Sequence, residues 1–187
     1  IKDNVLVRNI FIKPGDRYLQ SDLDLTYKRL QELNIFKFIN LYFREVPRDS
    51  ILNEYLLDLQ IQLTPTNKLD FTIESEITNT GSNIGLAGSF GYRNKNTFRG
   101  AEVLELKLKG GLEAIPNTKS ATDSKRLYVF NTYNIGPEAN FSLKKFLLPH
   151  FIEKNTSRFA NPKTNFNLGY DHQNSPDYDR SITNFGF

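Results

Sequence analysis

A two-residue alternation between residues 69 and 112 constrains this sequence more than any other feature. Its first segment, 69–78, carries apolar side chains at every second position except 75: Leu69, Phe71, Ile73 and Ile77. Successive side chains of a β-strand point to opposite faces, so this period predicts a strand with one apolar face. The alternation recurs in 84–92 and in 104–112, and the opposite face is charged or small each time. Because soluble β-sandwiches alternate in the same way, the pattern alone leaves open what covers the apolar face.

Other segments predict further strands, separated by turns rich in Gly, Pro, Asn, Asp and Ser. These predicted strands lie at 41–46, 55–63, 126–135, 164–171 and 181–187. Both faces of the segment 126–135 carry apolar residues, so its inward face stays unassigned. The segment 136–162 breaks the rhythm of strands and short turns, and the sequence predicts no shape for it.

Two helices are predicted near the N-terminus. Residues 21–33 carry an apolar stripe at helical spacing, with Ser21 as N-cap and Asn34 as a left-handed terminator. Residues 1–12 contain apolar pairs four apart, which favour a helix, and β-branched residues, which favour a strand; the helix is preferred. With the two strands that follow, these segments predict an α+β module over residues 1–65. Its predicted core is Leu23, Tyr27, Leu30, Leu33, Phe36, Leu57, Leu59 and Ile61.

Composition excludes several classes of protein. The 24 Lys and Arg residues exceed the 21 Asp and Glu residues only slightly and are scattered, which argues against nucleic-acid binding. No cysteine is present, so disulfides and cysteine-ligated metals are excluded. No run of about 18 apolar residues exists, so no membrane-spanning helix is predicted. A membrane-spanning strand needs only about 9–11 residues, so a membrane location stays open.

Side chains suited to catalysis or metal binding are few. His150 and His172 have no companion at metal-ligand spacing. Glu74 and Glu76 share a predicted strand face about 7 Å apart, and a solvated or lumenal face is favoured there over an acid–base pair. We therefore predict no catalytic residue, no bound cofactor, no metal and no enzymatic activity.

Three glycines recur at every third position of one predicted strand: Gly85, Gly88 and Gly91. They follow no junction between a strand and a helix, so a phosphate-binding loop is not predicted. Glycine inside a strand more often permits bending or a close backbone approach. The spacing therefore favours curvature of this strand.

Residues 15–43, GDRYLQSDLDLTYKRLQELNIFKFINLYF, combine a Gly-Asp pair, an aromatic residue, a leucine-rich helix and a Phe before a strand. This segment resembles the C-terminal half of a POTRA domain, a periplasmic polypeptide-transport-associated module. The matching positions are Asp16, Tyr18, Leu30, Leu33 and Phe36. Residues 83–114 are similar to the first strands of the BamA/TamA outer-membrane barrel superfamily, and most closely to the Bacteroidetes TamA-like lipoproteins. The turn that carries this similarity contains Asn96, Phe98, Arg99 and Gly100.

This resemblance implies an α+β POTRA-like module over 1–65 and, over 66–187, about six antiparallel transmembrane strands of a larger β-barrel. It implies a bacterial outer-membrane location, with residues 1–65 in the periplasm. The implied function is assembly or insertion of β-barrel proteins, or polypeptide translocation, without a cofactor. The implied partners are the lipid bilayer, unfolded outer-membrane clients and a periplasmic or inner-membrane assembly protein, with no nucleic acid.

Strand pairing at an opened seam is the mechanism that the resemblance implies. The first barrel strand exposes unpaired backbone groups there, and an incoming client strand adds to them. The residues assigned to this seam strand are Leu69, Phe71, Ile73, Ser75 and Ile77. The edge strand assigned to the POTRA-like module contains Leu41, Phe43 and Glu45. An ordinary closed strand at 69–78 is the alternative for the seam.

The implied orientation places the loops 79–83 and 115–125 outside the cell and the turn 94–100 in the periplasm. The residues predicted for an interfacial aromatic girdle are Tyr128, Phe130 and Tyr133. Two other classes stay open, namely a soluble β-sandwich module for binding or adhesion and a passive channel. The sequence does not determine the clients, an N-terminal lipid anchor or the number of upstream POTRA modules.

Overall fold

The computed structural model describes residues 1–46, 56–80, 83–115, 130–145, 147 and 162–187. Within these residues the chain forms two helices and eight strands, so it is mostly β. The helices are α1 (Asp3–Asn9) and α2 (Gln20–Glu32). The first two strands are β1 (Phe36–Val46) and β2 (Leu56–Pro65). The other strands are β3 (Leu69–Thr80), β4 (Asn83–Asn94), β5 (Val103–Ala114), β6 (Thr132–Leu143), β7 (Thr164–Ser175) and β8 (Tyr178–Gly186).

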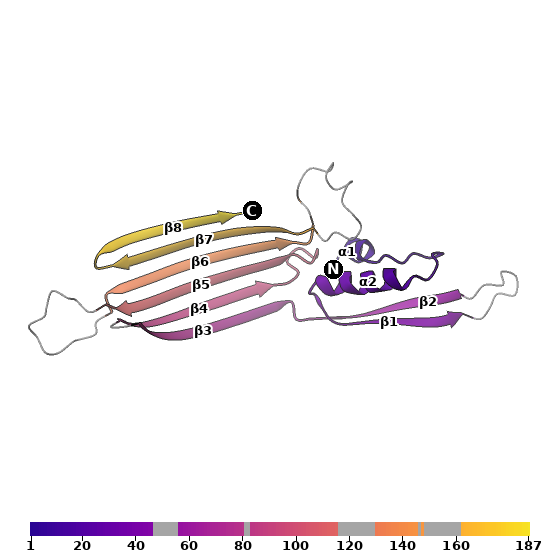
Figure 1. The fold of residues 1–187 in the computed structure, drawn as a ribbon, viewed down its shortest axis with the longest axis horizontal. Helices are drawn as coiled ribbons and strands as arrows, with labels where there is room; N and C mark the ends of the chain where they lie inside the picture. Colours follow the sequence, from indigo (N-terminus) through magenta and orange to yellow (C-terminus); the bar gives the residue numbers. More distant parts are fainter. Residues whose placement is uncertain (47–55, 81–82, 116–129, 146, 148–161) are drawn as a thin grey trace, which may run out of the picture. The chain divides into compact units, whose positions relative to one another are not determined.

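The chain divides into two compact units. The first contains Ile1–Lys68 and the turn Lys95–Ala101, and the strands from β3 to β8 belong to the second. In the first unit, β1 and β2 pair antiparallel as a two-stranded sheet, and α2 runs beside them (Figure 1). The buried core of this unit consists of Leu30, Leu33, Ile35 and Ala101.

The core of the first unit confirms the predicted core only in part. The predicted positions that are buried are Leu30 and Leu33, and those that are half-buried are Leu23, Phe36, Leu59 and Ile61. Tyr27 and Leu57 are exposed, so these two core assignments are wrong. Ile35 and Ala101 are buried although the sequence did not predict them. Ala101 was missed because it comes from the β4–β5 turn, far along the chain from α2.

A buried threonine replaces the predicted Tyr27 on the inner side of α2. The Thr26 hydroxyl donates a hydrogen bond of 2.7 Å to the carbonyl oxygen of Asp22. It also accepts a bond of 3.0 Å from the backbone N–H of Phe11. Because a buried polar group is costly unless it is hydrogen-bonded, these two bonds permit its burial and hold the segment after α1 against α2.

The helix ends confirm some predictions and correct one. α1 lies within residues 1–12, where the helix was preferred over a strand. Asn34 has a φ of 57°, which confirms it as the left-handed terminator of α2. The predicted N-cap at Ser21 is wrong, because the helix already includes Gln20 and its cap residue, Leu19, makes no side-chain capping bond.

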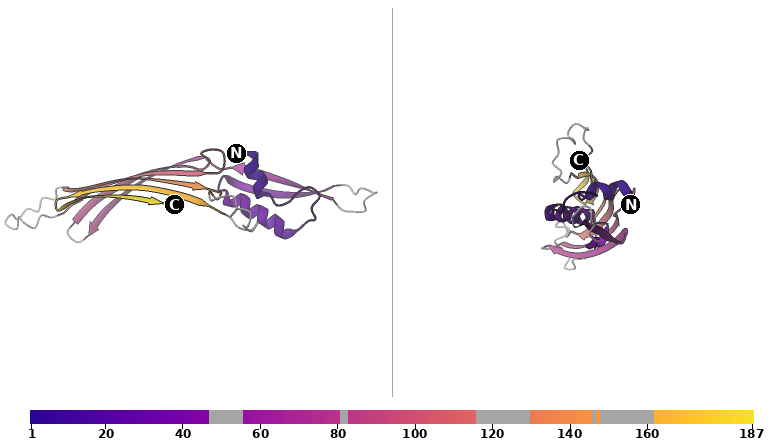
Figure 2. Two further views of the ribbon diagram at one scale, coloured as in Figure 1. Left: turned by 90° about the horizontal axis from the view of Figure 1, so that it is seen from above. Right: turned by 90° about the vertical axis from the view of Figure 1, so that its right-hand side faces the viewer.

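The second unit is one antiparallel sheet of six strands in sequence order, β3 to β8 (Figure 1). Each strand pairs with the next through a regular register; Phe71 lies opposite Tyr92, and Tyr92 lies opposite Leu106. The strands from β3 to β7 have 12 residues each, and β8 has 9. Figure 2 shows that the sheet is curved, and β3 and β8 lie at its two edges.

The predicted fold class is therefore wrong. We predicted an α+β POTRA-like module followed by the first strands of a transmembrane β-barrel. The described residues form two separate sheets with only two short helices, they show no POTRA-like α+β arrangement, and the larger sheet is open. The physical reason is that a local pattern specifies strands and their apolar sides, whereas closure depends on pairing between strands distant in sequence.

The alternation located most strands, and one prediction failed. Of the strand predicted at 126–135, residues 126–129 lie outside the described residues and 132–135 are confirmed, but the bounds are wrong, because β6 starts at Thr132 and continues to Leu143. Glycine followed by proline, as at Gly136 and Pro137, is typical of a turn that ends a strand, but both residues lie inside β6. Neither residue has a paired partner on β7, and the pairing of β6 with β7 resumes in the same register at Glu138. Proline has no N–H to donate to a neighbouring strand, in keeping with the absence of a paired partner for Pro137 on β7.

Candidate functional site

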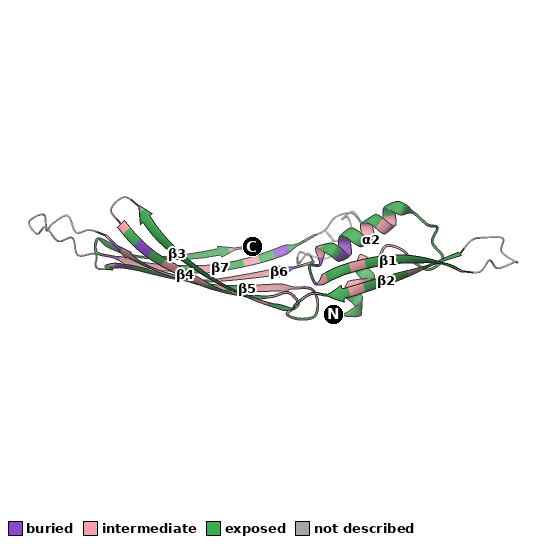
Figure 3. Cartoon of the chain, turned by 90° about the horizontal axis from the view of Figure 1, so that it is seen from below, coloured by how far each residue is buried: buried purple, intermediate pink, exposed green. Residues whose placement is uncertain are grey.

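One face of the six-stranded sheet is apolar and lies uncovered by other described residues. Directly paired residues of antiparallel strands share a face, so the register places these side chains together. This apolar face contains Phe71, Ile73, Ile77, Leu86, Phe90, Leu106, Leu108, Leu112, Ile135, Leu168 and Phe185. The side chain of Ile73 is 81% exposed and that of Phe71 is 63% exposed. Figure 3 shows β3 in the exposed colour along almost its whole length.

Aromatic side chains pack against one another on the apolar face near β3. The ring of Phe71 lies 5.5 Å from that of Tyr92 and 6.3 Å from that of Phe90, measured between centroids. Aromatic pairs at such distances add stability beyond the area that they bury. They also leave a wide aromatic surface at the β3 side of the sheet, where Phe71 itself is mostly exposed.

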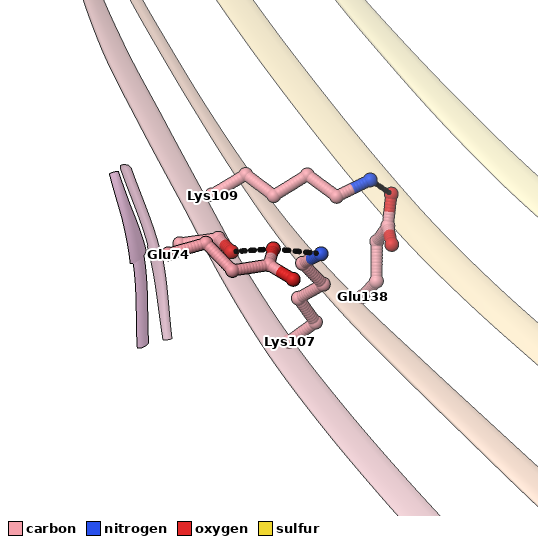
Figure 4. Close-up of polar contacts among 5 residues, drawn as sticks. Glu74, Lys107, Lys109 and Glu138 are labelled. Carbon is pink, nitrogen blue, oxygen red and sulfur yellow. Dashed lines mark hydrogen bonds and ion pairs between the residues drawn. The ribbon is translucent and has the colours of Figure 1, made fainter. Parts of the chain in front are cut away.

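The opposite face, here called the polar face, carries ion pairs that cross between strands. Lys107 Nζ of β5 lies 2.9 Å from Glu74 Oε2 of β3. Lys109 Nζ lies 2.5 Å from Glu138 Oε1 of β6 (Figure 4). A third pair joins Arg93 Nε to Glu105 Oε1 at 2.8 Å. An open hollow of about 410 Å³ lies among these charges, and its lining includes Asp70, Glu74, Arg93, Glu105 and Lys107.

The two glutamates that share a face of β3 have different surroundings. The carboxylate of Glu74 accepts bonds from the Ser89 hydroxyl, at 2.7 Å, and from Lys107. Glu76 lies opposite Ala87, which in turn lies opposite Gly111, so no polar side chain faces it from β4 or β5. An acid–base pair needs two carboxyl groups that converge on one substrate bond. These two instead have separate surroundings on an open sheet.

His172 lies near a serine and an aspartate on β8, but the three do not form a catalytic triad. Its Nδ1 lies 3.0 Å from Ser181 Oγ and 3.5 Å from Asp179 Oδ1. A triad places the serine on one ring nitrogen and the acid on the other, so that the imidazole accepts the serine proton while the acid orients the ring and stabilises its charged form. Here both neighbours approach the same nitrogen. The hydroxyl of Tyr170 donates a further bond to Ser181 at 3.1 Å.

Glycines shape a hollow in the apolar face. Gly88 of β4 lies directly opposite Gly110 of β5, and neither contributes a side chain to the surface. An open hollow of about 710 Å³ results, with Phe90, Leu108 and Ile135 in its lining. Gly85 of the same strand has little room for a side chain, because a Cβ added there would collide with the Thr78 side chain.

The predicted seam residues lie together on β3, at the edge of the sheet. Leu69, Phe71, Ile73, Ser75 and Ile77 alternate along this strand, which pairs only with β4 among the described strands. An edge strand presents outward N–H and C=O groups that another strand can bind. β3 therefore offers a backbone edge of 12 residues beside an exposed apolar face.

The predicted edge strand of the first unit lies in β1. Leu41 and Phe43 pair with Ile61 and Leu59 of β2, and β1 has no other neighbour among the described strands. The ring of Phe43 meets that of Tyr18 edge-on at 5.2 Å. Glu45 lies near the end of β1 and is exposed. This edge carries fewer exposed apolar side chains on one face than the edge at β3.

Several predicted features lie outside the described residues, including His150, Tyr128 and the loop 116–125. Of the predicted aromatic girdle, Phe130 and Tyr133 are described, and both are exposed. In the part of the chain that the structure describes, no cluster of three or more His, Asp or Glu side chains is arranged to hold a metal ion. No helix in that part is both long enough and apolar enough to cross a membrane.

The described geometry defines a class of protein with an open antiparallel sheet, one exposed apolar face, one charged face and a free strand edge. Such an arrangement leaves an apolar surface and an unpaired strand edge that are open to contact with other molecules. Sequence comparison adds no family to this description, because no protein-family model matches the chain and no curated protein matches it. The polar cross-strand pairs were not predicted, because the sequence does not show which charges become neighbours.

Proposed function

We propose that this chain works at the bacterial outer membrane, where it assembles or inserts β-barrel proteins, or translocates polypeptides, by pairing client strands with the edge of β3. The observation that carries the proposal is the exposed apolar face beside a strand edge that no described strand covers. The resemblance of the sequence to the BamA/TamA superfamily points to the same class of function. The proposed partners are the lipid bilayer, unfolded clients and a periplasmic or inner-membrane assembly protein.

The dimensions of the apolar face support hydrocarbon as its cover. The apolar positions of β3 run from Leu69 to Ile77, eight steps that span about 27 Å at the usual strand rise. The hydrocarbon core of a bilayer is about 30 Å thick, and lipid-facing bands of strands are about 25 Å tall. Strands packed in protein layers are usually shorter than the 12 residues found from β3 to β7. Both lengths favour lipid over a second layer of protein.

The edge of β3 supports strand pairing as the mode of action. In hydrocarbon, an unpaired backbone N–H or C=O group has no water to bind, so an open edge is unfavourable until another strand pairs with it. A client strand supplies the missing donors and acceptors through its own backbone. Because backbone pairing requires little of the client's sequence, one edge serves many clients. No covalent bond is made or broken in this step.

Site-specific cross-linking tests the proposal. A photoreactive amino acid replaces Ser75 on β3 in the full chain, which is reconstituted in lipid vesicles and mixed with an unfolded outer-membrane protein. The matched control carries the same group at Leu106, on the same face of the central strand β5. We expect client adducts at position 75 and few at position 106. Equal labelling at the two positions would contradict pairing at the β3 edge.

Partition between water and detergent separates the proposal from a soluble β-sandwich module for binding or adhesion. A protein whose apolar face needs hydrocarbon requires detergent to stay dispersed, whereas a soluble module does not. We expect the chain to aggregate without detergent and to float with lipid vesicles in a density gradient. A monodisperse protein that remains at the bottom of the gradient would favour the soluble module.

A further inference from the structure

The polar face of β3 is acidic, and this charge bears on which strands can pair with it. Its residues are Asp70, Thr72, Glu74, Glu76 and Thr78, so it carries three carboxylates and no basic group. Any strand added at the β3 edge places its own polar residues directly beside these side chains. This inference rests on the proposed function, because it assumes that a client strand pairs at that edge.

The three carboxylates differ in how far the sheet already compensates them. Glu74 is bound by Lys107 and Ser89. Asp70 lies opposite Arg93 in the register. Glu76 is exposed, and it makes no ion pair or hydrogen bond with any described residue, because Ala87 and Gly111 occupy the neighbouring positions on β4 and β5. Two of the carboxylates therefore have a basic residue bonded to them or opposite them in the register, whereas Glu76 has no basic residue opposite it on β4.

We propose that the β3 edge prefers client strands with a lysine or arginine on the polar face, placed to face Glu76. Opposite charges directly across two strands stabilise the pair, and like charges destabilise it. The client that fits best is an amphipathic strand, apolar on the lipid side and basic on the other. The same rule opposes pairing of β3 with β3 of a second copy, since that contact brings two acidic faces together.

Three synthetic peptides of twelve residues test the preference. They share one alternating apolar face and differ only on the polar face, which is lysine, glutamine or glutamate throughout. The full chain in detergent micelles carries a photoreactive group at Ser75, and adducts with each labelled peptide are quantified. We expect the lysine peptide to exceed the glutamine peptide by about two- to fivefold for each opposed charge pair, with the glutamate peptide lowest.

Charge reversal at Glu76 assigns the preference to one side chain. We expect Glu76→Lys to invert the order of the lysine and glutamate peptides and Glu76→Gln to reduce the difference between them. The matched control is Asp177→Lys, which makes the same change in net charge at an exposed turn between β7 and β8. We expect this control to keep the original order. An unchanged order in Glu76→Lys would overturn the assignment to Glu76.

The possible failures of the two proposals differ. Equal adducts with all three peptides would overturn the charge preference and leave strand pairing at β3 intact. Adducts with no peptide at Ser75 would overturn both, because the proposed function itself requires pairing there. A glutamate peptide that exceeds the lysine peptide would show that another group at the edge dominates, and it would also overturn the preference.

Discussion

Lys107 on β5 forms an ion pair with Glu74 on β3 although the whole width of β4 lies between the two strands. The Nζ and Oε2 atoms are 2.9 Å apart. The contact is diagonal, since Lys107 lies opposite Gly91 of β4 and Glu74 lies opposite Ser89. The small side chains of Gly91 and Ser89 leave the surface of β4 low between β3 and β5. The long side chain of Lys107 can therefore reach across β4 to Glu74. Small residues on β4 thereby permit an ion pair between β3 and β5, which share no backbone hydrogen bond.

A large side chain at Gly91 should interrupt this diagonal contact. We expect the coupling between Glu74 and Lys107, measured by a double-mutant cycle in urea unfolding, to disappear in the background of Gly91→Leu. Both side chains are solvent-accessible, so the coupling in the parent chain should be small and should weaken with added salt. Ala87→Leu, on the same face of β4, is the control and should retain the coupling. Persistence of the coupling in Gly91→Leu would show that the lysine takes another path.

Arginine substitutions on the two faces of β3 should show whether lipid or water contacts the apolar face. In vesicles, we expect Ile73→Arg to destabilise the folded chain by about 2–4 kcal/mol, the range for a cation at the bilayer midplane. Thr72→Arg, on the polar face one residue earlier, should change the folding free energy far less. The measurement is folding into vesicles as a function of urea concentration. Similar effects of the two substitutions would argue that water, and not hydrocarbon, reaches the apolar face.

Alanine at Gly136 should destabilise the six-stranded sheet. An added Cβ would lie 3.2 Å from the Tyr170 carbonyl oxygen and 3.0 Å from an oxygen of Asp171. Overpacking of this kind typically costs about 1–3 kcal/mol. The matched control is Gly110→Ala, whose Cβ would meet its nearest atom, the Asn134 carbonyl oxygen, at 3.7 Å. We expect this control to be neutral or to stabilise by up to about 1 kcal/mol in thermal unfolding, because it restricts the unfolded chain. Equal losses in both variants would exclude the local contact as the cause.

Replacement of the buried threonine of α2 should loosen the first unit. Thr26→Val keeps the shape of the side chain but leaves the Phe11 N–H without its acceptor. An unsatisfied buried donor costs about 1–3 kcal/mol, and we expect a loss of that size in urea unfolding. Thr26→Ser keeps the hydroxyl and should retain most of the stability. Hydrogen exchange at the Phe11 amide provides the direct measurement, since it should accelerate in the valine variant and stay slow in the serine variant.

Alternation and helical spacing located most elements of this protein from sequence. Residues 69–78, for example, place an apolar side chain at nearly every second position, and β3 covers this segment. The failures occurred where a local signal competes with a distant contact. Pro137 favours a break, but its pairing with Leu108 of β5 keeps it inside β6. Tyr27 completes an apolar stripe on α2, but the side that carries Thr26 is the buried one, and the backbone of Phe11 bonds to it.

The candidate site was predictable in its residues and not in its surroundings. Leu69, Phe71, Ile73 and Ile77 follow from the two-residue period, and they share one face of β3. That β3 lies at the edge of the sheet follows from the pairing of six strands, which no single strand specifies. The contrast between Glu74, which has a lysine from β5, and Glu76, which has none, also depends on the register of three strands.

By itself the sequence determined most of the segments that form strands and the apolar side of most of them, because both depend on the order of neighbouring side chains along one backbone. The tertiary structure alone decided that the six strands form an open sheet, that its apolar face stays uncovered by described residues and that charges meet across β4. These features depend on backbone pairing between segments far apart in the chain, and that pairing brings together side chains whose positions in the sequence are unrelated.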